Sequence, residues 1–325
     1  MRRFVILGLV VLLVVLLWSG LWQYGAEQVR AQIEALAENP SASLACGRLD
    51  IAGFPFRFDV TCSDATVVRL DLTARTPEIK ATALAYRPGH VIAFVKSPVA
   101  LSDAFFGTER ELRFEGAEAS LRLSGFLPES FALERFSVEL TGATLHDVLV
   151  GDETLLTLAT AEFHLLDSGA SDREPGGLAA YATAAGLDYP EAEIEAGTLI
   201  ATAMLTRFPR RLLDWSGPAL LSEWVEASGA LTLEEFAFTA DGLDIAATGN
   251  ASLDASGLIN GTLRTTSKGL IERLDLEFLG DTRPLFIGTP GADGSYTNQF
   301  SMRGGYLFAG IVPVPLLQLA IDPLF

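Results

Sequence analysis

The residues of this sequence that could perform chemistry are few, since it holds three histidines and two cysteines in 325 residues. His90 follows Pro88 and Gly89 at a predicted turn. A catalytic base needs a partner within hydrogen-bond reach, and the sequence places no candidate partner near His90. We therefore interpret His90 as a structural residue that orients a loop.

The other two histidines each stand beside a carboxylate. His146 precedes Asp147 near a predicted strand edge, which indicates a surface pair. His164 shares the polar face of a predicted strand with Glu162, and two ligands at this spacing could begin a metal site. Because the sequence identifies no third ligand, we expect no metal at either pair.

A run of glutamates is the remaining candidate for a cation site. Glu191, Glu193 and Glu195 alternate along a predicted strand, but an ordered calcium site takes oxygen ligands from several segments. We interpret the run as a solvated acidic face. The sequence also lacks a Gly-x-Ser-x-Gly elbow, a Walker A loop and a dinucleotide-binding glycine turn. We therefore expect no catalytic residue, no cofactor and no enzymatic activity.

Charge and composition narrow the partners of the chain. The formal net charge is −18, from 41 acidic and 23 basic residues. Nucleic-acid binding needs a basic stripe that pairs with phosphates, so nucleic acid is excluded as the main partner. Hydrophobic residues make up 49% of the chain, which is too many for a disordered protein.

The elements that position these residues begin with an apolar N-terminal segment. Arg2 and Arg3 precede Phe4–Trp22, which carries no charge. As a helix this segment is about 28 Å long, close to the thickness of one bilayer core. Trp18 and Trp22 stand at its far end, where aromatic rings prefer the interface, and the arginine pair predicts a cytoplasmic N-terminus. A cleaved signal peptide is the alternative, but no small-x-small cleavage site follows.

We therefore predict a transmembrane anchor at residues 1–24, a helical stalk at 25–40 and an exported β-rich domain at 41–325. Pro40 ends the stalk, because the residue before a proline avoids the helical conformation. The glycine-rich stretch 166–190 is a candidate junction between two halves, and a long surface loop explains it equally well. The protein would then be a single-pass inner-membrane protein with its body in the periplasm.

Beyond the stalk, apolar and polar residues alternate with a period of two. Leu243, Ile245 and Ala247 show the pattern, which is typical of antiparallel strands with one buried face. The clearest helical segment in this part is 220–225. We predict a mainly β fold, in which an N-terminal transmembrane helix precedes a large curved antiparallel sheet with a few short helices.

The two cysteines flank a predicted turn at Gly53-Phe54-Pro55. A hairpin that turns at Phe54 pairs residues whose numbers sum to 108, as those of Cys46 and Cys62 do. We therefore predict a disulfide, which an exported segment would keep oxidised; two unpaired buried thiols are the alternative. Apolar residues on the two arms require an odd sum instead, and a bulge would reconcile the two demands. These residues are Leu49, Ile51, Phe56, Phe58 and Val60.

Three segments together with the anchor resemble a known family. They are Gly53-Phe54-Pro55-Phe56 between the cysteines, Tyr86-Arg87-Pro88-Gly89-His90, and Gly304–Gly310 followed by Pro313-Val314-Pro315. The combination resembles the mainly alphaproteobacterial family known as domain of unknown function 2125. The resemblance implies a membrane-anchored, exported protein and carries over no catalytic residue. Its motif residues here are Gly53, Phe54, Pro55, Phe56, Tyr86, Pro88 and His90.

The segment Ala247–Gly261 is also similar, more distantly, to the strand-turn-strand units of AsmA-like proteins. Those proteins are anchored in the inner membrane and form long curved sheets linked to lipid transfer. The similarity and the one-sided strands favour a non-enzymatic envelope protein that binds or transfers lipid, which needs no polar motif. An envelope scaffold or assembly factor that binds other proteins is the alternative. A periplasmic hydrolase, the third hypothesis, would need a pocket that gathers His90, His164 and carboxylates.

Overall fold

The protein is mainly β, with 62% of its residues in strands of one large antiparallel sheet. This confirms the predicted fold class. The described part of the chain also contains three α-helices and one short 3-10 helix. The computed structural model describes residues 2–38, 43–125, 130–149, 151–169, 176–209, 211, 220–271, 273 and 283–315.

Two compact units divide the chain. Unit 1 comprises Met1–Leu121 and Leu140–Leu155, and unit 2 comprises Arg122–Glu139 and Leu156–Phe325. The predicted junction at 166–190 does not coincide with this division, because most of that stretch is a strand within unit 2. Its Gly186 has a φ of 64° at a register shift of the strand, so this glycine marks a β-bulge rather than a linker.

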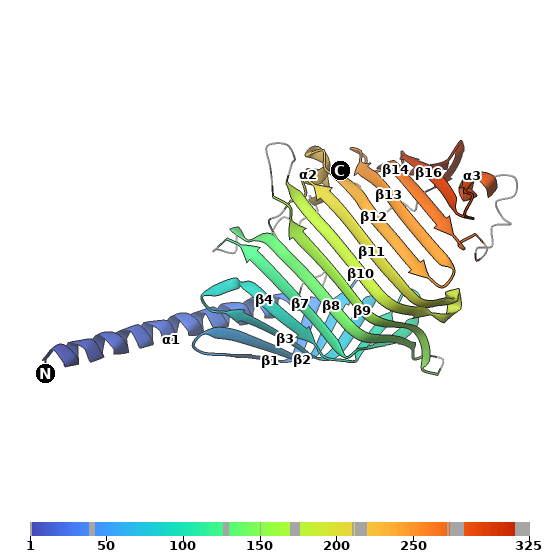
Figure 1. The fold of residues 1–325 in the computed structure, drawn as a ribbon. Coiled ribbons are helices and arrows are strands. Elements are labelled where there is room, and N and C mark those ends of the chain that lie inside the picture. The colour runs from blue at the N-terminus through green and yellow to red at the C-terminus, as the bar shows by residue number, and fades with distance from the viewer. Residues whose placement is uncertain are drawn as a thin grey trace. The chain divides into compact units, whose positions relative to one another are not determined.

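Unit 1 contains the long helix and the first strands of the sheet (Figure 1). Strands β1, β2, β3 and β4 pair in sequence order, and β3 also pairs with β5, which in turn pairs with β6. The elements of this part, the last three of which continue into unit 2, are α1 (Arg2–Leu36), β1 (Ser43–Ala52), β2 (Arg57–Arg69), β3 (Leu72–Leu84), β4 (Arg87–Val95), β5 (Val99–Asp103), β6 (Thr108–Arg113), β7 (Gly116–Ser124), β8 (Ala132–Asp147) and β9 (Glu153–Asp167).

Unit 2 is dominated by long strands that lie side by side in one sheet (Figure 1). From β9 to β14 each strand pairs with the next, and β14 pairs with β16. Its further elements are β10 (Gly177–Tyr189), η2 (Pro190–Ala192), β11 (Ile194–Thr206), α2 (Leu220–Glu226), β12 (Ala230–Ala240), β13 (Leu243–Leu253), β14 (Ile259–Lys268), α3 (Arg283–Ile287), β15 (Thr289–Pro290), β16 (Tyr296–Arg303), β17 (Tyr306–Ala309) and β18 (Val312–Pro315).

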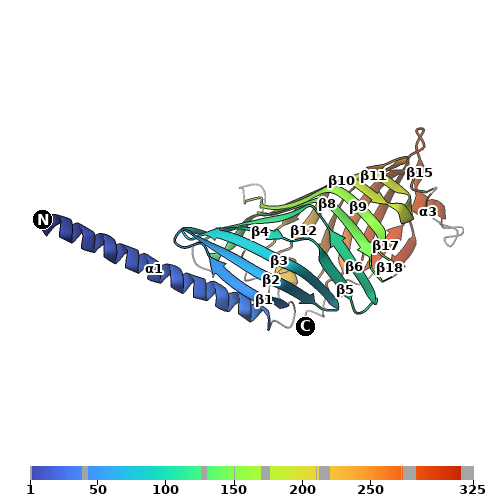
Figure 2. The same ribbon diagram turned by 90° about the horizontal axis from the view of Figure 1, so that it is seen from below.

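Helix α1 is the one helix of the described residues that is long and apolar enough to cross a membrane. It runs without interruption through the predicted anchor and ends at Leu36, inside the predicted stalk; the predicted stop at Pro40 lies outside the described residues. Its first half extends away from the strands of unit 1 (Figure 2). The side chains there are exposed, as Phe4 at 80% illustrates. An apolar surface of this size is unfavourable in water and favourable in lipid.

A disulfide joins Cys46 of β1 to Cys62 of β2, as predicted. The expected register is wrong, however, because the paired residues sum to 111 and Cys62 lies opposite Leu49. This odd sum is the one that the apolar residues of the two arms require. Pairing is interrupted at Gly47 and Asp64, where Asp64 has a φ of 50°, and the two cysteine Cα atoms lie 5.2 Å apart across this irregularity.

Candidate functional site

Helix α1 contacts the β1–β2 hairpin through stacked aromatic rings. The Trp22 ring stacks on Phe58 with 5.4 Å between ring centroids, and it meets Phe54 edge-on at 5.5 Å. Both arrangements suit the charge distribution of aromatic rings. The second half of the helix is therefore fixed to the hairpin rather than free of it.

Two indole N–H groups reinforce this contact. Trp18 donates a hydrogen bond to the carbonyl oxygen of Pro55 at 2.9 Å, and Trp22 donates one to that of Arg57 at 3.0 Å. Trp18 and Trp22 are four residues apart, so they lie on the same helix face. This spacing could have predicted a contact with the rest of the protein. Tryptophans that only anchor a helix at the membrane interface do not need to lie on the same helix face.

Five of the seven family motif residues lie at what we call the turn end of unit 1, which comprises the turns Gly53–Phe56 and Ala85–Tyr86, whereas Pro88 and His90 belong to β4. The backbone N–H of Ala85 donates to the carbonyl oxygen of Phe56 at 2.8 Å, so the two turns are adjacent. Phe54, Phe56 and Tyr86 are 51%, 65% and 68% exposed. Three large aromatic side chains are thus presented to the surroundings beside the α1 contact.

The register of unit 2 sorts its side chains into an apolar face and a polar face. Because opposite residues of paired strands share a face, the pairings extend each set across seven strands, and the mainly apolar set also includes Asp167, Thr265, Ser267 and Asn298. The predicted alternation in β13 is confirmed. The apolar face comprises Phe163, Leu165, Ala180, Ala182, Leu199, Ala201, Ala203, Leu205, Leu231, Leu233, Phe236, Phe238, Ile245, Ala247, Ala251, Leu263, Phe300 and Met302.

This apolar face is only partly covered. Phe238 is buried at 8%, Phe163 is exposed at 39%, and the other side chains of the face are half-buried. A filled sandwich core would bury them almost completely. Their neighbours along the strands, such as Tyr181 and Thr202, belong to the polar face. A bulge in β12 directs both Glu234 and Glu235 to solvent and thereby keeps the apolar face free of charge there.

Helix α2, which confirms the helix predicted at residues 220–225, packs at the end of β11. Trp224 is buried, and its indole N–H donates to the carbonyl oxygen of Thr206 at 2.8 Å. Its ring also meets that of Phe208 at 5.9 Å. This contact is local, because Thr206 is the last residue of β11 and Phe208 lies just beyond it.

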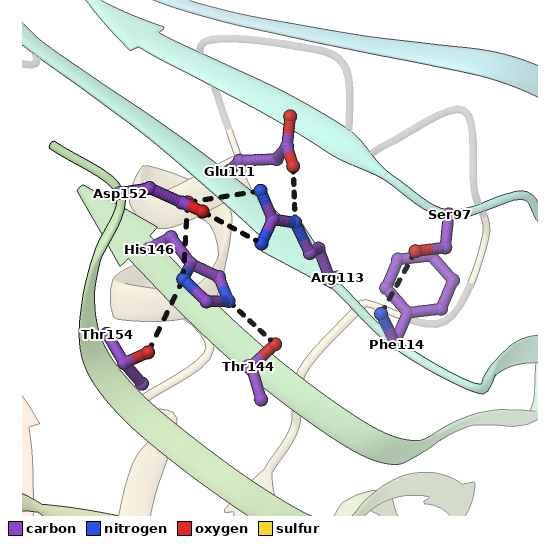
Figure 3. Close-up of polar contacts among 8 residues, drawn as sticks. All are labelled: Ser97, Glu111, Arg113, Phe114, Thr144, His146, Asp152 and Thr154. Carbon is purple, nitrogen blue, oxygen red and sulfur yellow. Dashed lines mark hydrogen bonds and ion pairs between the residues drawn. The ribbon is translucent and has the colours of Figure 1, made fainter. Parts of the chain in front are cut away.

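His146 lies in a polar network on β8 (Figure 3). Its Nδ1 is 3.4 Å from the Asp152 carboxylate and 3.4 Å from the Thr154 hydroxyl, and its Nε2 is 3.1 Å from the Thr144 hydroxyl. The expected pair with Asp147 is therefore replaced by one with Asp152. Neighbouring residues of a strand point to opposite faces, which is why sequence adjacency was misleading here.

Arg113 determines what this network can do. Its guanidinium donates to both Asp152 oxygens at 3.1 and 3.3 Å and to Glu111 at 2.6 Å (Figure 3). The hydrogen bonds that Arg113 donates to Glu111 and then to Asp152 raise the pKa of Arg113. A hydroxyl, His146 and Asp152 follow the order of a hydrolytic triad, but Asp152 is half-exposed and already paired with Arg113. We interpret the cluster as a structural ion-pair network.

The other histidines have separate partners. His164 lies 3.2 Å from Glu162 and 2.9 Å from the Ser137 hydroxyl, and it stacks on Tyr181. His90 lies within β4 rather than in a turn, 3.5 Å from the Ser120 hydroxyl. Among the described residues no group of three His, Cys, Asp or Glu side chains could hold a metal ion.

The glutamate run does not lie along one strand. Glu191 belongs to η2 and accepts a hydrogen bond from the Tyr189 hydroxyl at 2.7 Å, Glu193 has a φ of 53°, and Glu195 lies in β11. The expectation of a shared strand face is therefore wrong. Pro190 explains the difference, because its fixed φ favours the first turn of a helix.

Two aspartates fix turns of unit 2. The backbone N–H of Ala196 and the Thr157 hydroxyl bind Asp188 and lower the pKa of that carboxyl. The pKa of Asp254 is lowered chiefly by the backbone N–H of Leu258, at 3.0 Å. Hydrogen bonds to the ionised form are the cause in both cases. These carboxylates are bound within the turns and are not candidate bases.

The fold and these contacts define a mainly β protein with one N-terminal helix that is long and apolar enough to cross a membrane. The chain belongs to the bacterial family described as "Uncharacterized protein conserved in bacteria (DUF2125)", whose model matches residues 22–318. This confirms the resemblance drawn from the motif residues. Comparisons with curated proteins and with solved structures found no match.

Proposed function

We propose that the protein is a non-enzymatic, membrane-anchored envelope protein that binds lipid on the apolar face of unit 2. The carrying observation is the extent of that face, which continues over seven paired strands with most side chains half-buried. Each CH₂ group that leaves water contributes about 0.8 kcal/mol. An acyl chain can therefore bind such a face without any polar recognition motif.

The proposed location follows from two features of unit 1, helix α1 and the disulfide. Helix α1 would cross the inner membrane with Arg2 and Arg3 in the cytoplasm, because positive residues remain on that side. The Cys46–Cys62 disulfide is of the kind that persists in an oxidising compartment, which suits a periplasmic body. The distant similarity of Ala247–Gly261 to AsmA-like proteins supports the same location and a role in lipid transfer.

Bound lipid can be measured directly on the full-length protein in detergent. Ala203 lies on the apolar face between Ala180 and Leu233, and its neighbour Thr202 lies on the polar face. We expect native mass spectrometry and lipid extraction to find phospholipid with the wild type and with Thr202→Asp. Ala203→Asp should lose it, because a carboxylate cannot be desolvated cheaply against an acyl chain. Absence of lipid from the wild type, or equal lipid in both variants, would contradict the proposal.

A second candidate function is that of an envelope scaffold. The loops that join β2 to β3 and β5 to β6 are adjacent, since the N–H of Ala104 donates to the carbonyl oxygen of Asp71 at 2.9 Å. They expose Leu70, Phe105 and Phe106 at 85%, 75% and 74%, and exposed apolar clusters mark protein-binding sites. Photo-crosslinking from position 105 in intact envelopes should then give one dominant protein adduct, and a diffuse set of adducts would remove this candidate.

A further inference from the structure

We infer that the turn end of unit 1 enters the periplasmic interface of the bilayer that α1 crosses, with Phe54, Phe56 and Tyr86 among the lipid headgroups and upper acyl chains. This inference rests on the proposed function in one respect, since it takes α1 as a membrane anchor. It adds a contact with this bilayer beyond the one that α1 makes. That contact is made by the sheet rather than by the helix.

The depth of the turn follows from its hydrogen bonds to α1. If the hydrocarbon core starts at Phe4, a helix that rises 1.5 Å per residue reaches its far boundary after about 20 residues. Trp18 and Trp22 then lie within the last about 8 Å of that span. Because these indoles donate directly to the carbonyl oxygens of Pro55 and Arg57, the Gly53–Phe56 turn lies at the same depth.

The side chains at this end are those that a bilayer interface favours. Phe54, Phe56 and Tyr86 are all more than half exposed, and aromatic rings concentrate at the headgroup level. Arg57 and Arg87 flank them and are also exposed. Arg57 is paired with Asp59 at 2.6 Å, so Arg87 is the side chain that would extend its charged end toward phosphates. The formal charge of the whole chain is −18. A surface with arginine beside exposed aromatic side chains is therefore less acidic than the average surface of the protein.

Unit 1 contains its own control for this inference. Phe105 is an equally exposed phenylalanine, and it lies near Leu72, at the opposite end of β3 from Leu84 and the turn end. Thirteen residues of strand separate the two ends, a distance of about 40 Å at the usual rise of a strand. Phe105 should therefore lie outside the bilayer in which Phe56 is inserted.

The test replaces single residues of the full-length protein by the photoreactive p-benzoylphenylalanine in intact envelopes. We expect phospholipid adducts from Phe56 and from Tyr86, and none above background from Phe105. Thiol alkylation serves as the folding control, because an intact Cys46–Cys62 disulfide leaves no thiol to alkylate. Carbonate extraction tests the anchor separately.

Each outcome has one meaning. Retention in the carbonate-washed membrane with lipid adducts at positions 56 and 86 alone supports the inference. Retention without lipid adducts at those positions, or with equal adducts at 105, overturns the inference and leaves the proposed anchor standing. Loss of the protein from the washed membrane overturns both the anchor and the inference, while lipid binding by unit 2 is still decided by the Ala203 and Thr202 variants.

Discussion

Replacing Trp224 by alanine is expected to open one end of unit 2 and to raise hydrogen exchange in β11 and β12 by about a hundredfold or more. The buried indole packs against Phe208 and donates its N–H to the carbonyl oxygen of Thr206. Removal of a buried tryptophan side chain costs about 3–5 kcal/mol, and each 1.4 kcal/mol is about tenfold in an opening equilibrium. Peptides that cover 199–206 and 230–238 report the effect.

A conservative variant separates packing from hydrogen bonding. Trp224→Phe keeps most of the buried ring and loses the N–H, so its exchange should rise far less, by about the 1 kcal/mol of one hydrogen bond. Peptides from β1 and β2 in unit 1 should exchange at the wild-type rate in both variants. Equal protection of β11 in wild type and Trp224→Ala would show that α2 does not hold this end of the sheet.

Loss of the disulfide is expected to produce the second large effect, in unit 1. Cys46 and Cys62 close a loop with a sequence separation of 16, for which the stabilisation is about 3 kcal/mol. The double variant Cys46→Ser, Cys62→Ser should therefore raise exchange in β1 and β2 by about a hundredfold. Non-reducing mass mapping of the native protein should find the peptide that contains both cysteines.

Unit 2 is the internal reference for this variant. Exchange in β12 and β13 should be unchanged, because these strands belong to the other compact unit. Wild-type protein treated with a reductant should reproduce the rise in β1 and β2. Two alkylatable thiols in the native protein, or unchanged exchange in the double variant, would contradict the assigned role of the disulfide.

The sheet was predictable because its signal is local. In β13 the alternation of Leu243, Ile245 and Ala247 with mostly polar neighbours specifies one solvent-exposed and one buried face, whatever the register with the adjacent strands. The continuous apolar run of α1 was equally plain. Both patterns depend on the residue types within one element, so a single sequence contains them.

The register and the partners across strands depend on longer-range geometry. The apolar arms of the first hairpin indicated an odd sum correctly, but the sum of the two cysteines pointed to another register, and only the irregularity at Gly47 and Asp64 accommodates both. His146 was read beside its neighbour Asp147, whereas its partner Asp152 comes from the following loop. A pairing of this kind requires the strand connection to be known first.

The sequence predicted what kind of candidate site to expect, but not where in the fold it lies. Strands with one apolar face suggested an apolar lipid-binding surface. The glycines of 166–190, however, suggested a junction between two halves, whereas the structure has strand β10 there, which continues the apolar face with Ala180 and Ala182. The turn end was anticipated only as a family motif. Its adjacency to Tyr86 and to the indoles of α1 follows from pairings among β2, β3 and the helix.

The central claim is that the apolar face of unit 2 binds lipid, and two aromatic residues test it most directly. Phe163 on the apolar face and Tyr181 on the polar face lie on adjacent strands and are 39% and 38% exposed. With p-benzoylphenylalanine at either position in intact envelopes, we predict phospholipid adducts from position 163 and none above background from position 181. Equal lipid adducts from both positions, or protein adducts alone from position 163, would contradict the claim.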